Sequence, residues 1–217
     1  MTMLNTISLR GLLVDEMTST SSINGAVTYH GTVCVTRQSG AVDRIPIALE
    51  SSKIPNLNPF DLCGRLVTIS GEVRTFTRSD QAAGHRHQVV VWVHSMYRSP
   101  DGVKDDQLVN LEGVLCSPPK FRVTPLGREI CELMVACNRG VKSSYIPVIC
   151  WGRVAREMST AQVGDKVEMA GRFQSRKYEK KLNFVANGEP VSVWRTAHEI
   201  SANTCRVVGM QRRMRAE

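Results

Sequence analysis

The sequence of 217 residues lacks several features that would assign a protein class at once. Its seven cysteines form no C-x-x-C pair, which argues against a structural zinc site. Their odd number argues against a complete set of disulfides. We therefore expect reduced, mostly buried thiols in a cytoplasmic protein. No apolar run approaches the roughly 18 residues that span a membrane, and residues 1–10 show no signal-peptide pattern.

Catalytic signatures are also missing. No Gly-rich phosphate loop precedes a predicted helix, and no G-x-S-x-G motif occurs. His85, His87 and His94 have no Cys or carboxylate at ligand spacing, so we interpret them as exposed hairpin histidines. The sequence predicts a protein that is not an enzyme and that needs no cofactor and no metal.

The positive charge lies in the second half of the chain. Residues 1–109 hold ten Lys or Arg and ten Asp or Glu, whereas residues 110–217 hold eighteen and ten. The whole net charge of +8 therefore belongs to the second half. A solvated basic surface would explain this, but so would a polyanionic partner bound by that half.

Two sequence blocks recur at an offset of about 100 residues. Residues 44–49 (RIPIAL) resemble 145–150 (YIPVIC), and residues 64–73 (GRLVTISGEV) resemble 164–173 (GDKVEMAGRF). The shared offset indicates a duplicated domain with a boundary near 99–108, where residues 99–102 (SPDG) are typical of a turn.

Each unit is predicted to be a small barrel. Strands rich in Val, Ile and Thr are expected at 27–36, 44–49, 66–76 and 88–94, and again at 108–116, 130–138, 145–151, 166–176 and 190–196. Gly71 and Gly171 fall inside strands, where Gly indicates a bulge or bend. Residues 152–158 have the apolar spacing of one short helix. Five strands with an insertion after the third predict an all-β fold of two tandem five-stranded OB-fold barrels.

Binding of single-stranded nucleic acid requires cations along the phosphates and aromatic side chains that stack on bases. Tyr145 and Trp151 stand six positions apart on one predicted strand, so they share a face. Tyr178 follows Arg172 and Arg176 at even spacing, and we expect a basic hairpin with this tyrosine near its tip. The alternative is that Tyr145 and Trp151 pack in a core. The predicted basic contacts are Arg122, Arg139, Lys142, Arg153, Arg172, Arg176, Lys177 and Lys180.

Four segments of the second unit follow the order of a known set of motifs. They read NLEGVL at 110–115, FRVTPLG at 121–127, YIPVICWGR at 145–153 and GDKVEMAGRFQSRKY at 164–178. Together they resemble the bacterial single-stranded DNA-binding protein family, with its R-x-T-x-x-G, W-x-x-V-x-x-F-G-K and G-x-x-V-x-x-x-G-x-x-x-x-R-x-W patterns. The resemblance spans roughly 110–196. It implies an OB fold and base stacking by Tyr145, Trp151 and Tyr178.

The first unit departs from that pattern. Arg44, Glu50 and Arg78 stand where the second unit has its three aromatics. The acidic C-terminal tip of the family is absent, and residues 211–217 read QRRMRAE. Related primosomal replication proteins share the fold and also lack the tip. We expect a degenerate structural or assembly domain at 1–104, a DNA-binding domain at 105–197 and a basic tail at 198–217.

The sequence thus predicts sequence-independent binding of single-stranded DNA in replication, recombination or repair. Two alternatives stay open: an RNA-binding OB protein, and a replisome or primosome adaptor with weak DNA binding. Further expected partners are replication or recombination proteins. Because two-barrel members of the family act as dimers, the resemblance implies a homodimer. Residues 89–93 (VVVWV), apolar without alternation, are covered on both faces or leave one for a partner.

Overall fold

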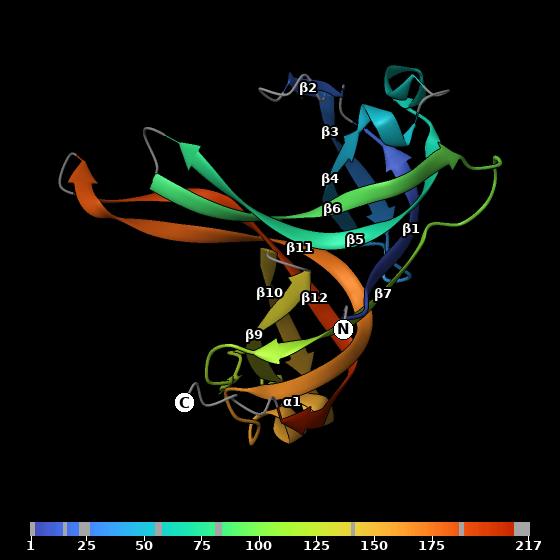
Figure 1. The fold of residues 1–217 in the computed structure, drawn as a ribbon. Helices are drawn as coiled ribbons and strands as arrows, with labels where there is room; N and C mark the ends of the chain where they lie inside the picture. The colour runs from blue at the N-terminus through green and yellow to red at the C-terminus, as the bar shows by residue number, and fades with distance from the viewer. Residues whose placement is uncertain are drawn as a thin grey trace, which may run out of the picture.

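The computed structural model describes residues 3–14, 17–21, 27–54, 58–80, 84–139, 142–186 and 189–210, and almost every element in it is a strand (Figure 1). One twelve-stranded sheet runs through the molecule and curls into two barrels. The predicted all-β class is therefore confirmed.

The first barrel is closed by five strands, each paired with the next in the order β1-β3-β4-β6-β5 and back to β1. Its elements are β1 (Asn5–Leu13), the short edge strand β2 (Thr18–Ser21), β3 (Val27–Thr36), β4 (Val42–Glu50), the 3₁₀ turns η1 (Ser51–Lys53) and η2 (Pro59–Leu62), β5 (Leu66–Asp80) and β6 (Gly84–Arg98).

The second barrel closes in the same way, in the order β7-β9-β10-β12-β11 and back to β7. Its elements are β7 (Asp106–Leu115), β8 (Lys120–Val123), β9 (Glu129–Arg139), β10 (Lys142–Trp151), the helix α1 (Gly152–Met158), β11 (Asp165–Ala186) and β12 (Glu189–Met210). The predicted helix at 152–158 is confirmed, and it buries Ala155 and Met158 against the barrel.

Alternation along each strand determines which side chains fill the barrels. On β11, Val167, Met169 and Phe173 are buried, and Gly171 lies on the same inward side. A Cβ on Gly171 would stand 2.2 Å from the carbonyl oxygen of Ser201, so only Gly allows this approach. The pairing register shifts between Ala170 and Gly171. Gly71 occupies the same place in the first barrel, and the expected bulges are confirmed.

The two barrels join through β1 and β7, which pair antiparallel from Asn5↔Leu111 to Arg10↔Asp106. Beside this pairing, backbone and side chain bond across the seam in a reciprocal way. The Arg44 amide donates to Ser175 Oγ at 2.9 Å, and the Tyr145 amide donates to Thr75 Oγ1 at 3.1 Å. Arg44 and Tyr145 are equivalent positions of the repeat, so the seam has approximate twofold symmetry.

A buried carboxylate fixes one side of this seam. Asp43 is 0% exposed. It accepts hydrogen bonds from the Arg37 guanidinium (Nε at 2.6 Å) and from the Ser175 amide at 2.8 Å. Gln107 Nε2 donates to the same carboxylate at 3.4 Å. Because Asp43 and Arg37 belong to the first barrel and Ser175 to the second, this group holds the barrels in one arrangement.

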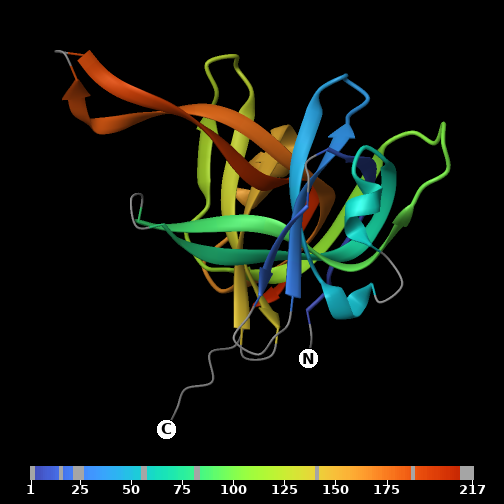
Figure 2. The same ribbon diagram turned by 90° about the horizontal axis from the view of Figure 1, so that it is seen from above.

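Two sequence-based expectations need correction. The basic tail was placed at 198–217, but β12 continues to Met210 and pairs with β11 as far as Asp165↔Met210. Tyr178 was expected near a hairpin tip, but β11 runs on to Ala186, so Tyr178 lies well before the tip, near the base of the arm. Figures 1 and 2 show this β11–β12 arm and the β5–β6 hairpin leaving the barrels on the same side.

All seven cysteines are free thiols, four of them buried. Burial raises the pKa of the Cys137 thiol to about 12, and a hydrogen bond with Cys205 together with burial raises the pKa of Cys150. These thiols are therefore protonated and unreactive at neutral pH. No helix within the described ranges is long and apolar enough to cross a membrane.

Candidate nucleic-acid interface

Strand β10 separates core side chains from an outward-facing row. Ile146, Val148 and Cys150 point inward and are buried. Tyr145, at the start of the row, is 51% exposed, and Trp151, at its end, is partly exposed. The structure therefore places both aromatics outside the core, on one face, as the spacing predicts.

A hydrogen bond orients Trp151. Its indole Nε1 donates to Ser201 Oγ at 3.1 Å, and Ser201 lies on the neighbouring strand β12. Ser201 is buried and pairs in register with Arg172 on β11. Trp151, Ser201 and Arg172 thus form a continuous row across three strands. The polar edge of the indole is fixed, and part of its ring stays open to solvent.

The β11–β12 arm extends this face. Every second residue of β11 from 172 to 178 lies on the same side of the strand as Ser201 and Trp151. These residues are Arg172, Gln174, Arg176 and Tyr178. The Arg176 guanidinium lies 5.8 Å from the centre of the Tyr178 ring, within the range of a cation–π contact. Lys177 is exposed on the opposite side of the strand. The arm therefore carries the cation and aromatic pattern that single strands require.

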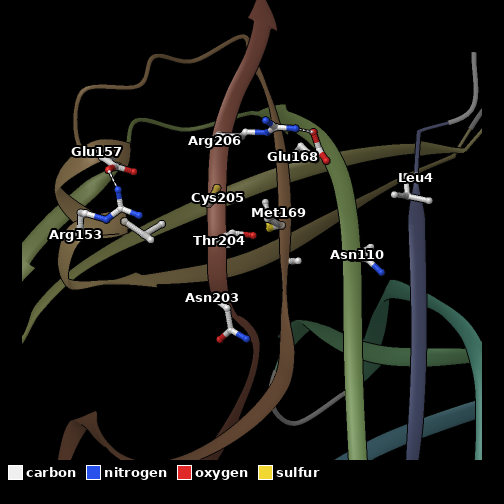
Figure 3. A pocket seen from close by; sticks show the side chains of 12 residues that line it. Leu4, Asn110, Arg153, Glu157, Glu168, Met169, Asn203, Thr204, Cys205 and Arg206 are labelled. Carbon is white, nitrogen blue, oxygen red and sulfur yellow. Dashed lines mark hydrogen bonds and ion pairs between the residues drawn. The ribbon is translucent and has the colours of Figure 1, made fainter.

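The other predicted basic residues differ in their surroundings. Arg122 pairs with Glu132 at 2.6 Å, and Lys142 is exposed. Arg153 pairs with Glu157 at 3.1 Å, in a separate hollow between α1 and strands β11 and β12 (Figure 3). That hollow also contains the Glu168–Arg206 pair. The side chains of Arg139 and Lys180 lie outside the described residues.

Sequence reasoning missed three residues of the arm and of the hollow beside Trp151. Trp194 on β12 is 73% exposed and pairs with Glu179, so it lies on the side of the arm opposite Tyr178. Its position beside Arg195 was a usable signal. Arg37 and Arg128 line a hollow next to Trp151, and no local pattern could place them there.

The equivalent face of the first barrel has aromatics at other positions. Phe76 is 41% exposed, and its ring centre lies 5.7 Å from that of Trp92. The Arg74 guanidinium lies 4.1 Å above the Trp92 ring. Trp92 is consequently only 9% exposed, so the apolar strand at 89–93 is covered from within its own barrel. The side chain of Arg78 is outside the described residues.

The histidines give no sign of a metal centre in the described part of the chain, where no group of three or more His, Cys, Asp or Glu could hold an ion. His94 is exposed. The side chains of His85 and His87 lie outside the described residues.

Fold and site define a class: tandem OB barrels, one of which carries an outward aromatic and basic sheet face. Residues 107–208, which span most of the second barrel, match the model of the Single-strand binding protein family. The resemblance inferred from the motifs is confirmed.

Solved structures show the same fold over almost the whole chain. The wild-type single-stranded DNA binding protein from Thermus aquaticus aligns with a TM-score of 0.73 and 18% identity, covering 95% of this chain and 94% of that one. A deletion mutant of the same protein aligns with a TM-score of 0.72 and 18% identity, covering 95% of each chain. No curated protein matches the sequence.

Proposed function

We propose that this chain binds single-stranded DNA through the outward face of its second barrel and along the β11–β12 arm. The observation that carries the proposal is the placement of Tyr145, Trp151 and Tyr178 outside the core, beside Arg172 and Arg176, on one continuous face. Aromatic rings at such spacing stack on unpaired bases while arginines neutralise the phosphates.

The face favours contacts that accept any sequence. Stacking uses the flat surface that every base presents, and contacts from guanidinium groups to phosphates carry no sequence information. The chain would therefore cover and organise single strands during replication, recombination or repair, without catalysing a reaction. Its cysteines are free thiols, in keeping with the reducing cytoplasm, which we propose as its compartment.

The two barrels would contribute unequally. In the second barrel both Tyr145 and Trp151 stay accessible, whereas in the first barrel Arg74 and Phe76 cover Trp92. The excess of positive charge also belongs to the second half of the chain. We propose that the second barrel provides most of the affinity and that the first supports its geometry through the seam.

A competition experiment tests this function. The full chain, at one fixed salt concentration, is given a labelled single-stranded DNA together with unlabelled single strand, duplex or RNA of equal length. We expect the single-stranded DNA to compete best, and the duplex worst because its bases are stacked internally. Equal competition by RNA would support the RNA-binding alternative, and absence of binding to every competitor would leave the adaptor role.

A further inference from the structure

A hollow at the seam between the barrels is lined by four arginines. Arg37 comes from the turn between β3 and β4 of the first barrel, and Arg128, Arg172 and Arg176 come from the second. Trp151 forms part of the same wall. The hollow encloses about 560 Å³, which is ample for a phosphodiester group and its hydration.

The charges in this hollow are only partly balanced. Arg37 pairs with the buried Asp43, and Arg176 lies 3.6 Å from a Glu199 carboxylate oxygen. Arg128 and Arg172 have no carboxylate partner among the described residues. Four guanidinium groups therefore face two carboxylates, and the excess of two positive charges lies beside the face proposed to bind DNA.

Arg172 is the least satisfied member of the group. Its Nε is buried and has no hydrogen-bond partner in the described structure. Among the described residues, its terminal Nη2 donates to the Gln174 side-chain oxygen alone, at 3.4 Å. Burial, and then the repulsion of Arg37, lower the pKa of the Arg172 guanidinium. A buried donor without an acceptor is costly, and an anion in the hollow would offset the unbalanced charge of this guanidinium.

The Arg37 side chain is held in place at the hollow by hydrogen bonds. The Asp43 carboxylate accepts hydrogen bonds from the Arg37 guanidinium and from the Ser175 amide of β11. The turn that presents Arg37 is closed by two backbone hydrogen bonds, Arg37 N to Ala41 O at 2.8 Å and Gly40 N to Arg37 O at 2.9 Å. The first barrel thus supplies a preorganised cation to the face of the second.

The opposite side of the seam provides an internal comparison. The pairing registers place Glu72 where the second barrel has Arg172, and Phe76 where it has Arg176. Ser144 likewise stands in the position of Asp43. The same architecture therefore carries a cationic hollow on one side and a carboxylate with an aromatic ring on the other. The charge is a property of these side chains and not of the fold.

We propose that this seam hollow, bounded by Arg37 of the first barrel and Arg128, Arg172 and Arg176 of the second, binds one backbone phosphate of the DNA strand adjacent to the base stacked on Trp151. The inference rests on the proposed function, and it adds that the first barrel contacts the strand directly through Arg37. Bidentate arginine contacts suit phosphate oxygens.

Arg172→Gln tests the phosphate contact, with Arg206→Gln as the matched control. Arg206 carries the same charge and lies on β12 in the other hollow (Figure 3). We expect Arg172→Gln to weaken binding of a thymidine oligonucleotide about tenfold. The slope of log K against log salt should become shallower by about 0.7, the loss of one phosphate contact. Arg206→Gln should change neither quantity.

The free protein distinguishes a binding role from a structural one. Because Arg172 lacks a partner for its Nε, the thermal stability of Arg172→Gln should equal or exceed that of the unaltered chain. A thymidine oligonucleotide with uncharged methylphosphonate linkages should bind the unaltered chain and Arg172→Gln alike. A persistent difference on that neutral backbone would overturn the phosphate assignment.

The role of Arg37 is tested without leaving the buried Asp43 carboxylate unpaired. Asp43→Asn removes the carboxylate alone, and Arg37→Gln combined with Asp43→Asn removes both charges. We expect the double variant to bind DNA several-fold more weakly than Asp43→Asn, since the two differ only in the guanidinium. Equal affinity would remove the first barrel from the site.

The outcomes separate the two proposals. If the chain binds single strands and loses affinity with Tyr178→Ala, while Arg172→Gln behaves like Arg206→Gln, the seam site is wrong and the proposed function stands. If the unaltered chain does not bind single-stranded DNA, both are wrong.

Discussion

At the scale of single residues, the candidate site depends on which side of a strand each aromatic occupies. Tyr178 shares the side of Arg176 and pairs with Arg195, whereas Trp194 pairs with Glu179 on the reverse side of the arm. The Arg176 guanidinium lies over the Tyr178 ring, and only Tyr178 continues the face that begins at Tyr145.

Tyr178→Ala should therefore weaken binding of single-stranded DNA about tenfold or more, since each stacked base contributes roughly 1–3 kcal/mol. Tyr178→Phe keeps the ring and should bind almost normally. Trp194→Ala, on the reverse side, should change the affinity less than about twofold. Fluorescence titration at fixed salt measures all three, and a larger effect of Trp194→Ala would place the strand on the other side of the arm.

Sequence reasoning found the aromatics of this face because strand parity is local. Tyr145 and Trp151 needed only the alternation of β10 to be assigned to one side. Arg37 was beyond such reasoning, because it reaches Trp151 only through the packing of one barrel on the other. Tertiary contacts of this kind leave no pattern in the sequence around the residue.

At the scale of secondary-structure elements, the close approach at Gly171 sets the shape of the second barrel. The backbone of β12 passes so near that a methyl group on Gly171 would meet both Ser201 O at 2.2 Å and Ala202 Cα at 2.9 Å. Ser201 is also the residue that orients Trp151. The bulge therefore connects barrel closure with the position of a proposed stacking residue.

Gly171→Ala should destabilise the protein by about 1–3 kcal/mol, the usual cost of overpacking, and should also reduce DNA affinity by moving Ser201. Gly209→Ala is the control, because it lies on the same strand pair with no atom within 4 Å of its new Cβ. Urea unfolding followed by circular dichroism gives the stability. Equal stability of the two variants would contradict the role assigned to this bulge.

The strands were predictable where their alternation continued into a barrel core. Residues 166–176 fill the second barrel with Val167, Met169 and Phe173, and their pattern is clear. Beyond Arg176, β11 leaves the barrel, so burial no longer imposes a pattern and the sequence resembles a polar loop. This explains why the length of the arm was missed. The end of β12 was missed for another reason: Ile200, Ala202 and Cys205 are buried in the barrel, but the shift in pairing register opposite Gly171 interrupts their alternation.

At the scale of the whole molecule, the seam holds a histidine between the two barrels. His198 Nε2 lies 3.2 Å from the carbonyl oxygen of Arg44, across the seam. Burial lowers the pKa of His198, against the opposing effects of that carbonyl and of the Asp43 and Glu199 carboxylates. The folded state therefore favours the neutral ring.

The free energy of unfolding should consequently decrease in mild acid. Because the folded pKa lies below the ordinary value of about 6.5, the unfolded chain takes up the proton first as the pH falls. The contribution of His198 is fully present above about pH 6.5 and is lost as the pH falls through the lower, folded pKa. Thermal melts of His198→Gln between pH 5 and 7.5 should show a flatter pH profile than the unaltered chain. Parallel profiles would show that His198 does not titrate in this range.

The duplication and the fold of the two units were visible in the sequence, but their relative placement was not. The β1–β7 pairing depends on both units at once, and neither strand carries a signal for the other. That pairing also creates a surface that neither barrel would have alone, on the outer side of β6, β5, β1, β7 and β11. Exposed large hydrophobic side chains lie on this surface: Leu12 on β1, Leu108 on β7 and Tyr97 on β6.

We propose that this outer surface joins two copies of the chain, since the dimer expected from the family resemblance needs an accessible face and the strand at 89–93 does not offer one. Light scattering at micromolar concentration should give a mass of twice 24.1 kDa. Leu108→Lys, which places a charge on the exposed side of β7, should return the mass to 24.1 kDa without unfolding the barrels. Trp92→Ala should not dissociate the dimer, because Arg74 and Phe76 already cover that ring. A mass of one chain for the unaltered protein would mean that the paired barrels are sufficient by themselves, and the exposed leucines would then be ordinary surface residues.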